Sequence, residues 1–240
     1  MQHEPPRPLL ELAGIAVGYR RMQVLWGVDL VVNEHESVVL LGANGSGKTT
    51  LLKAVMNLVE VFAGRIRFAT EDITRLRIDQ RVRRGIVFMS ETSGFPGLTI
   101  EENLLIGAQF LAGQRARRRI DELYAAFPVL AERRRAAAGS LSGGQRKMLG
   151  IAKALIGNPR LLIMDEPSAG LSPLYVKEVI SVLSRFRAED LALLIAEQNA
   201  KFLVLADRVY TLDNGRIGFS GTVAAMQEND ALRRAYFGLQ

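Results

Sequence analysis

The segment from Ser37 to Leu58, SVVLLGANGSGKTTLLKAVMNL, constrains the fold of this chain more than any other. It opens with a short apolar, β-branched run that predicts a buried strand, and from Thr49 to Leu58 its apolar residues recur at helical spacing. Between the two, Gly42, Gly45 and Gly47 leave the backbone free to curl until its N–H groups point inward at anionic oxygens. The segment therefore predicts a phosphate-binding loop between a strand and a helix.

Two side chains of this loop have the chemistry that nucleotide phosphates need. Lys48 adds a mobile positive charge for the β- and γ-phosphates, and the Thr49 hydroxyl is placed to ligate Mg²⁺. The helix that follows presents its positive N-terminus to the same phosphates. A glycine-rich turn that matches by chance is the alternative, which the strand before and the helix after disfavour. The residues expected to contact the phosphates are Gly42, Asn44, Gly45, Ser46, Gly47, Lys48, Thr49 and Thr50.

A second apolar run, Leu161 to Met164, ends in Asp165-Glu166-Pro167. Such a run predicts a buried parallel strand whose last carboxylates lie at the carboxyl edge of the sheet, where ligands of open α/β sheets bind. Asp165 would hold Mg²⁺ through water, and Glu166 would orient or deprotonate the attacking water. Two adjacent surface acids are the alternative, and the preceding run argues against it.

The pentapeptide LSGGQ directly precedes a helical pattern that is apolar on one face. It is a second candidate anion site at a helix N-terminus, because Ser142 can offer its hydroxyl while Gly143 and Gly144 expose backbone N–H groups beside Gln145. A plain N-cap with a glycine-containing turn is the alternative. The phosphate loop earlier in the chain favours the functional interpretation.

The remaining pattern is typical of a single α/β domain with a helical insertion. Further strands are expected at Leu9–Val17, Val28–Val32, Gly64–Phe68, Gly85–Met89 and Leu191–Ala196, and a hairpin at Arg208–Leu212 and Arg216–Ser220 through Asp213-Asn214-Gly215. From about Thr99 to Ala138 the chain is mostly helical in pattern, with Thr99 as a cap and a break at Pro128. Helices are also expected at Val176–Phe186 and towards Leu239.

Composition narrows the classes of protein that fit. The 240 residues include no cysteine, which excludes disulfides, and the opening MQHEPPRPLL gives no expectation of a secretory signal. No apolar segment approaches the length of about 18 residues that spans a bilayer. The net charge of +6 comes mainly from arginine clusters at 81–84, 115–119 and 133–135. Contact with nucleic acid or anionic lipid is one interpretation of them, and a solvated helix face is the favoured one.

With these motifs in this order, the chain resembles the ATP-binding subunits of ABC transporters over almost its full length. GANGSGKTT corresponds to the family's Walker A motif, LSGGQ to its signature sequence, and LLIMDE to its Walker B motif with the catalytic glutamate at Glu166. Tyr19 falls where the family has an aromatic residue that stacks on adenine. The residues alone favour this role and packing of Tyr19 on its own sheet equally.

The resemblance implies a P-loop NTPase fold with a RecA-like core, an antiparallel β edge subdomain and a helical subdomain insertion. It predicts one ATP-binding domain over residues 1–240, with the core and antiparallel sheet at about 9–90 and 141–240 and the helical subdomain at about 91–140. It also implies ATP and Mg²⁺ as ligands. Two subunits would sandwich two ATP molecules head to tail, each ATP contacting Walker A of one subunit and Ser142 to Gln145 of the other.

Three positions depart from the family pattern. Glu91 stands where the family usually has glutamine; it could still ligate Mg²⁺ but adds a negative charge. Gln198 occupies the place of the switch histidine, so it can donate a hydrogen bond to the γ-phosphate but cannot carry a proton. Ser172 stands where aspartate is common.

These departures, with Glu197-Gln198-Asn199 and the ending Ala235-Tyr236-Phe237-Gly238, resemble the shorter ATPase subunit of branched-chain amino acid importers. That resemblance implies transmembrane permeases, a second ATP-binding subunit (a paralogue or a second copy) and, indirectly, a periplasmic binding protein as partners. It places the chain peripherally on the cytoplasmic face of the inner membrane, with no nucleic acid partner. A coupling helix of a permease would enter the cleft around Glu91 to Leu98. Importers of urea or short amides, an ATPase acting on nucleic acid or ribosomes, and a nucleotide sensor are the alternatives.

Overall fold

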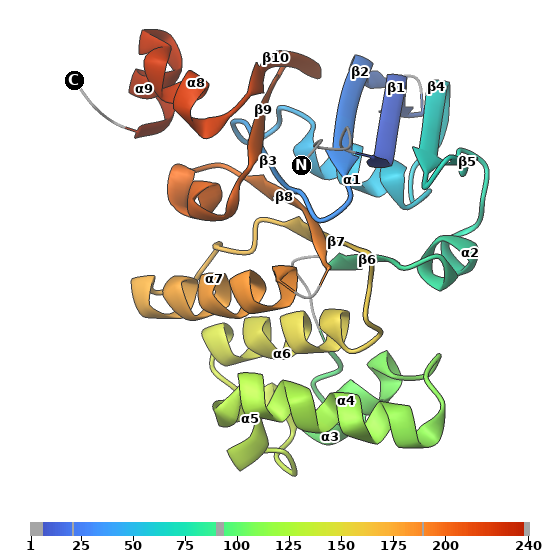
Figure 1. Cartoon of the computed structure of the whole chain (residues 1–240), viewed down its shortest axis with the longest axis vertical. Coiled ribbons are helices and arrows are strands. Elements are labelled where there is room, and N and C mark those ends of the chain that lie inside the picture. The colour runs from blue at the N-terminus through green and yellow to red at the C-terminus, as the bar shows by residue number, and fades with distance from the viewer. Residues whose placement is uncertain (1–6, 21, 90–93, 189, 238–240) are drawn as a thin grey trace, which may run out of the picture.

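A computed structural model describes residues 7–20, 22–89, 94–188 and 190–237 of the chain. Its centre is a six-stranded sheet with the strand order β10-β9-β3-β8-β7-β6 (Figure 1). The strands are β3 (Ser37–Leu41), β6 (Ile86–Met89), β7 (Leu161–Asp165), β8 (Ala192–Glu197), β9 (Arg208–Asp213) and β10 (Arg216–Gly221). All neighbouring strands are parallel except the edge pair formed by β9 and β10. The expected α/β class with a P-loop NTPase core is confirmed.

The parallel register brings the carboxyl ends of three strands to one edge of this sheet. Leu41 at the end of β3 lies opposite Glu197 at the end of β8, and Asp165 at the end of β7 lies opposite Ala196. Strand β3 begins and ends where its apolar run predicts, because both of its faces are buried. Ligand-binding side chains of the loops after β3 and β7 therefore meet at this edge.

A second, antiparallel sheet packs beside the first in the order β2-β1-β4-β5. Its strands are β1 (Pro8–Tyr19), β2 (Met22–Asn33), β4 (Val61–Phe68) and β5 (Glu71–Asp72). Helix α1 (Lys48–Val55) lies between the two sheets, since its Leu51 and Leu52 share one buried apolar cluster with Leu10 of β1 and Leu40 of β3.

The predicted helical stretch is divided into α3 (Ile100–Gly107), α4 (Gly113–Ala126), α5 (Pro128–Glu132) and the short η1 (Ala138–Ser140), followed by α6 (Gly143–Leu155). Thr99 caps α3, its hydroxyl accepting a hydrogen bond of 3.1 Å from the Glu102 N–H. Pro128 is the first residue of α5, so the expected break is confirmed. Helices α3–α5 lie at the end of the molecule opposite the antiparallel sheet (Figure 1). The numerical subdomain boundaries stay a prediction.

The remaining helices are α2 (Ile78–Arg83), α7 (Pro173–Arg187), η2 (Ala200–Leu205), α8 (Val223–Glu228) and α9 (Asp230–Phe237). Helix α2 and strand β5 are not foreseen from the sequence. The hairpin of β9 and β10 is, and its turn residues Asn214 and Gly215 have the positive φ angles, 48° and 76°, that such a turn needs. No helix within the described ranges has the length and apolar character to span a membrane.

The arginine cluster at 81–84 corrects one sequence-based interpretation. Arg81 is fully buried, and its guanidinium donates hydrogen bonds to the carbonyls of Ala54 and Val55 at the end of α1 and to carbonyls of the segment 73–76. Burial lowers its pKa to about 10. A solvated helix face is therefore wrong for this residue, which instead ties α1 to the segment before α2.

Candidate nucleotide site

The loop between β3 and α1 has the backbone shape of an anion cradle. Gly45 and Gly47 have φ angles of 80° and 109°, in the left-handed region that glycine adopts without strain. At Gly42 a β-carbon would lie 2.6 Å from the carbonyl oxygen of Leu212, so no side chain fits there. A cavity of about 300 Å³ opens in front of the loop, lined by Val24, Asn44, Gly45, Gly47, Lys48, Thr49, Thr50 and Glu166.

Lys48 is folded back into the loop. Its side chain is only 4% exposed, and its ammonium donates to the carbonyls of Gly42, at 2.8 Å, and Ala43, at 3.1 Å. The same nitrogen lies 3.5 Å from a carboxylate oxygen of Glu166. The geometry thus places the expected phosphate-binding cation and the expected catalytic carboxylate at one cavity.

Asp165 lies at the end of β7 with its side chain half-buried. Its Oδ1 atom is buried and has no hydrogen-bond partner among the described residues. Burial raises the pKa of this carboxyl, and a hydrogen bond with Thr49 acts in the opposite direction. An unpartnered carboxylate oxygen beside a hydroxyl suits a hard cation such as Mg²⁺, which binds one or two protein oxygens and completes its shell with phosphates and water.

Glu166 is held by its backbone while its side chain faces the cavity. Its N–H donates to the carbonyl of Ala196, at 2.9 Å, and its carbonyl accepts from the ammonium of Lys147, at 3.1 Å. Its φ of 45° is uncommon for a residue other than glycine. A third of its side chain is exposed, which leaves the carboxylate accessible to water.

Two other expected site residues, Tyr19 and Gln198, lie outside the lining of this cavity. Tyr19 ends β1, half-exposed, with its hydroxyl 3.4 Å from that of Thr50. Gln198 is exposed just after β8. Glu91 lies outside the described residues.

The LSGGQ segment forms the N-terminus of α6. Ser142 is the N-cap, accepting a bond of 3.3 Å from the N–H of Gln145, and the Gln145 side chain accepts one of 3.0 Å from the Ser142 N–H. Gly144 packs so closely that a β-carbon would lie 2.5 Å from the ring of Tyr175, whereas Gly143 is exposed. The plain cap is thus formed, and none of the four residues lines the phosphate cavity.

Three neighbours of the site make contacts that the motifs do not predict. Val24 of β2 lines the cavity, Lys147 of α6 holds the Glu166 carbonyl, and Glu197 ends β8 with its side chain 1% exposed. Of these, only Glu197 carries a sequence signal: an acid ends an otherwise apolar parallel strand, as Asp165 does. The other two contacts depend on the tertiary packing.

Comparison with known proteins identifies the family. The family model described as "ABC transporter" matches residues 25–169. The high-affinity branched-chain amino acid transport ATP-binding protein BraG of Pseudomonas aeruginosa is 37% identical over 96% of this chain and 100% of its own length. The lipopolysaccharide export system ATP-binding protein LptB of Haemophilus influenzae is 35% identical over 97% and 98%.

Among solved structures, the ADP conformation of MJ1267, an ATP-binding cassette of an ABC transporter, superposes with a TM-score of 0.86. It is 26% identical, with 97% of this chain and 99% of that chain covered. Fold, motifs and relatives agree: the chain belongs to the ABC transporter family, as an ATP-binding subunit that hydrolyses ATP.

Proposed function

We propose that this chain is the ATP-hydrolysing subunit of an importer for branched-chain or related amino acids, working with partner permeases. The observation that carries the hydrolytic part is the 3.5 Å approach of Lys48 to Glu166 at the phosphate loop. The amino acid part is supported by the similarity to BraG along nearly the whole chain and by the Glu197-Gln198-Asn199 and Ala235-Tyr236-Phe237-Gly238 segments.

In the proposed reaction the phosphates of ATP bind the N–H groups of the loop and the N-terminus of α1. Lys48 exchanges part of its contact with loop carbonyls and Glu166 for phosphate oxygens. Glu166 then accepts a proton from water as the water oxygen attacks the γ-phosphorus in line. The bond from that phosphorus to the β–γ bridging oxygen breaks, and ADP and phosphate are the products.

Thr49 and Asp165 are the described residues proposed to hold Mg²⁺, with Glu91 as a further ligand. The unpartnered Oδ1 of Asp165 supports this assignment. When bound, the ion neutralises negative charge on the β- and γ-phosphates. Gln198 is proposed to donate a hydrogen bond to the γ-phosphate, and Tyr19 to stack on adenine beside the loop.

A second ATP-binding subunit, a paralogue or another copy, is proposed to complete each site head to tail. Ser142 and Gly143 are exposed at the start of α6, and no LSGGQ residue lines the phosphate cavity of its own chain. These residues are therefore available to an ATP molecule held by another subunit. The N-terminus of α6 adds a favourable dipole for its phosphates.

A groove of about 710 Å³ between the core and the helical part is the proposed docking site for a permease. It combines aromatic side chains with charges that are all basic among the described residues that line it, which suits an amphipathic segment bearing carboxylates. Residues that line it include Ile78, Arg83, Phe88, Phe95, Phe110 and Lys153. Docking there would hold the subunit peripherally on the cytoplasmic face of the inner membrane.

Lipopolysaccharide export is the second candidate, because the 35% identity of LptB is close to that of BraG. Nucleic acid is a less well supported partner. Arg81 is buried, and Arg119 pairs with Glu122 at 2.8 Å and lies over the ring of Phe186. Two clustered arginines are thus used inside the protein.

Co-purification of the tagged full-length chain from gently solubilised membranes, with mass spectrometry of the attached proteins, tests the proposal. We expect a paralogous ATPase and two hydrophobic permeases, whose associated binding protein then identifies the solute. Recovery with lipopolysaccharide-export components would favour the second candidate. Recovery from the soluble fraction with nucleic acid or ribosomes would contradict a transport role and leave the ATPase chemistry intact.

A further inference from the structure

Glu197 is a buried carboxylate next to the candidate nucleotide site. Its side chain is 1% exposed at the end of β8. Oε1 accepts a hydrogen bond of 2.8 Å from the Ser168 N–H, and Oε2 accepts one of 2.9 Å from the Ser168 hydroxyl. A carboxylate that receives two good donors from one residue fixes the orientation of that residue closely.

Ser168 belongs to the turn that follows the proposed catalytic glutamate. The Ala169 N–H donates to the Glu166 carbonyl, at 3.1 Å, and the Leu171 N–H donates to that of Ser168, also at 3.1 Å. The turn is therefore hydrogen-bonded from Glu166 onward. Holding Ser168 fixes the backbone that carries the Glu166 side chain.

Two further parts of the site meet the same residue. Gln198 follows Glu197 directly in the chain, and the Gly42 N–H donates to the Glu197 carbonyl, at 3.3 Å. Glu197 thus touches the start of the phosphate loop, the turn after Glu166 and the proposed γ-phosphate contact. Its side chain holds the turn, and its backbone contacts the phosphate loop and continues into Gln198.

Burial makes the ionised form of the Glu197 carboxyl less stable at this position. Burial raises the pKa of Glu197, and the charge of Glu166 acts in the same direction. The donors from Ser168 offset that effect. Glu197 is 1% exposed and both of its carboxylate oxygens are hydrogen-bonded to Ser168, so the side chain is not free to contact a phosphate.

We infer that Glu197 is a positioning residue for ATP hydrolysis, which sets Glu166 and Gln198 in register by holding Ser168. The inference rests on the roles proposed for Glu166 and Gln198. It assigns the residue no contact with ATP, so its loss should lower the hydrolysis rate and leave ATP binding nearly unchanged.

The test compares Glu197→Ala, Glu197→Gln and Ser168→Ala with a matched control, Glu36→Ala. Glu36 is also a buried carboxylate, 8% exposed, in the connection from β2 to β3, and accepts a bond of 2.7 Å from the Asn33 N–H. It lies at the opposite edge, before β3. For each full-length protein we would measure melting temperature, ATP affinity, ATP hydrolysed per bound ATP, and hydrogen–deuterium exchange over residues 166–171 and 198–200.

In Glu197→Ala we expect faster exchange in both segments, ATP affinity within about twofold of wild type, and hydrolysis per bound ATP reduced about tenfold or more, as loss of alignment produces. Glu197→Gln should recover most of the rate. Its amide can accept from the Ser168 N–H and donate to the Ser168 hydroxyl. Glu36→Ala should lower the melting temperature without changing hydrolysis per bound ATP.

Wild-type hydrolysis per bound ATP in Glu197→Ala, or an equal loss in Glu36→Ala, would overturn the inference. If Glu197→Ala does not fold, Ser168→Ala decides. It removes one donor, and an unchanged exchange and rate there would likewise overturn the inference. Glu166→Gln separates the two proposals. Normal hydrolysis in Glu166→Gln would refute the role proposed for Glu166 itself. Loss of hydrolysis in Glu166→Gln together with a wild-type rate in Glu197→Ala would refute only the inference about Glu197.

Discussion

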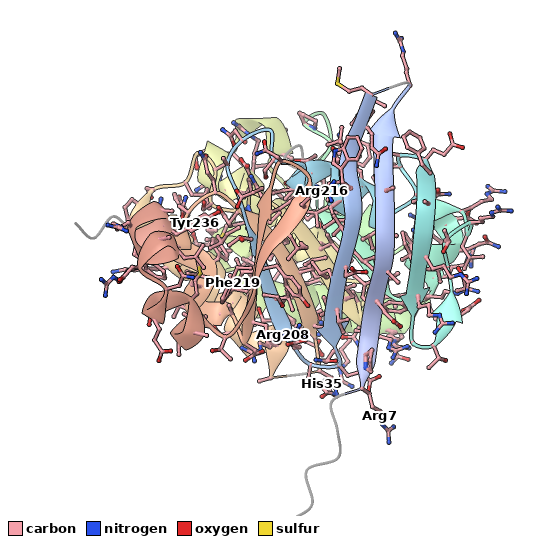
Figure 2. All side chains as sticks on the ribbon, turned by 90° about the horizontal axis from the view of Figure 1, so that it is seen from above. Arg7, His35, Arg208, Arg216, Phe219 and Tyr236 are labelled. Carbon is pink, nitrogen blue, oxygen red and sulfur yellow. The ribbon has the colours of Figure 1, made fainter. Side chains whose placement is uncertain are left out.

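Similar carboxylates lie in different surroundings at the two ends of the parallel strands in the six-stranded sheet. We call these ends the amino edge, where the strands begin, and the carboxyl edge, where they end. At the amino edge, Glu36 pairs with Arg208 at 3.3 Å, and Asp207 accepts from the Ser37 N–H, at 2.9 Å, and pairs with Arg187. Figure 2 shows Arg208 and His35 towards the amino edge and Arg216 towards the carboxyl edge. Each of these two carboxylates faces an arginine of the protein itself.

At the carboxyl edge the acids lack such arginine partners among the described residues. Asp165 keeps a buried oxygen without a partner, and burial raises the pKa of both Asp165 and Glu197. The cation here is Lys48, which reaches Glu166 at 3.5 Å while also bonding to loop carbonyls. The difference supports the proposal that ligands supply the missing charge at the carboxyl edge, whereas the carboxylates of the amino edge contribute stability.

The largest effect is expected from Lys48→Ala, which removes the cation from the carboxyl edge. We expect ATP hydrolysis to fall by about 100-fold or more, as loss of a preorganised electrostatic contact does in other active sites. Steady-state phosphate release measures the rate, and circular dichroism checks the fold. A rate within threefold of wild type would show that this edge does not depend on its cation.

Glu36→Ala tests the amino edge. It leaves the Asn33 N–H and the Arg208 guanidinium without their carboxylate, and we expect the free energy of unfolding to fall by roughly 2–3 kcal/mol. Urea denaturation measures the loss. A stability equal to wild type would remove the distinction between the two edges.

Asp165→Asn should raise the free energy of unfolding, whereas Glu36→Ala lowers it. Because burial raises the pKa of Asp165, the folded state holds its proton more tightly than the unfolded state does. The contribution of this group to stability is therefore present below the unfolded pKa and is lost as pH rises through the folded pKa. We expect the variant, measured with a chelator and no nucleotide, to be more stable at pH 7 by about 1 kcal/mol.

The pH series provides the control for that variant. As the pH rises from acid towards neutral, the stability of Asp165→Asn should increase relative to that of wild type, because the variant lacks the group whose contribution is lost. Identical slopes would mean that Asp165 is not under the electrostatic stress that its burial implies.

The smallest effect is expected from Tyr19→Ala at the margin of the site. Loss of a stacking surface should weaken ATP binding by about three- to fivefold, and Tyr19→Phe should change it by less than about twofold because the ring remains. Titration with a fluorescent ATP analogue measures both. Equal affinities in all three proteins would favour packing of Tyr19 on its own sheet.

The carboxyl edge was largely predictable from the sequence, because its parts are contiguous motifs with strong local signals. The strand Ser37–Leu41 is bounded by a glutamate and a glycine, and the hairpin turn has residues that accept positive φ. Helix α2 was not predictable, since its six residues are stabilised by Arg81 reaching carbonyls far along the chain. The link from Glu197 to Ser168 joins residues 29 positions apart and has no local signature.

The fate of ATP bound to Glu166→Gln tests most directly whether the carboxyl edge is the hydrolytic site. The purified full-length variant and wild type would be incubated with Mg²⁺ and ATP, and the bound nucleotide separated and identified. We expect wild type to yield ADP and the variant to retain intact ATP at similar occupancy, because its phosphate loop is unchanged. ADP formation by the variant at the wild-type rate would contradict the assignment of the carboxyl edge as the hydrolytic site.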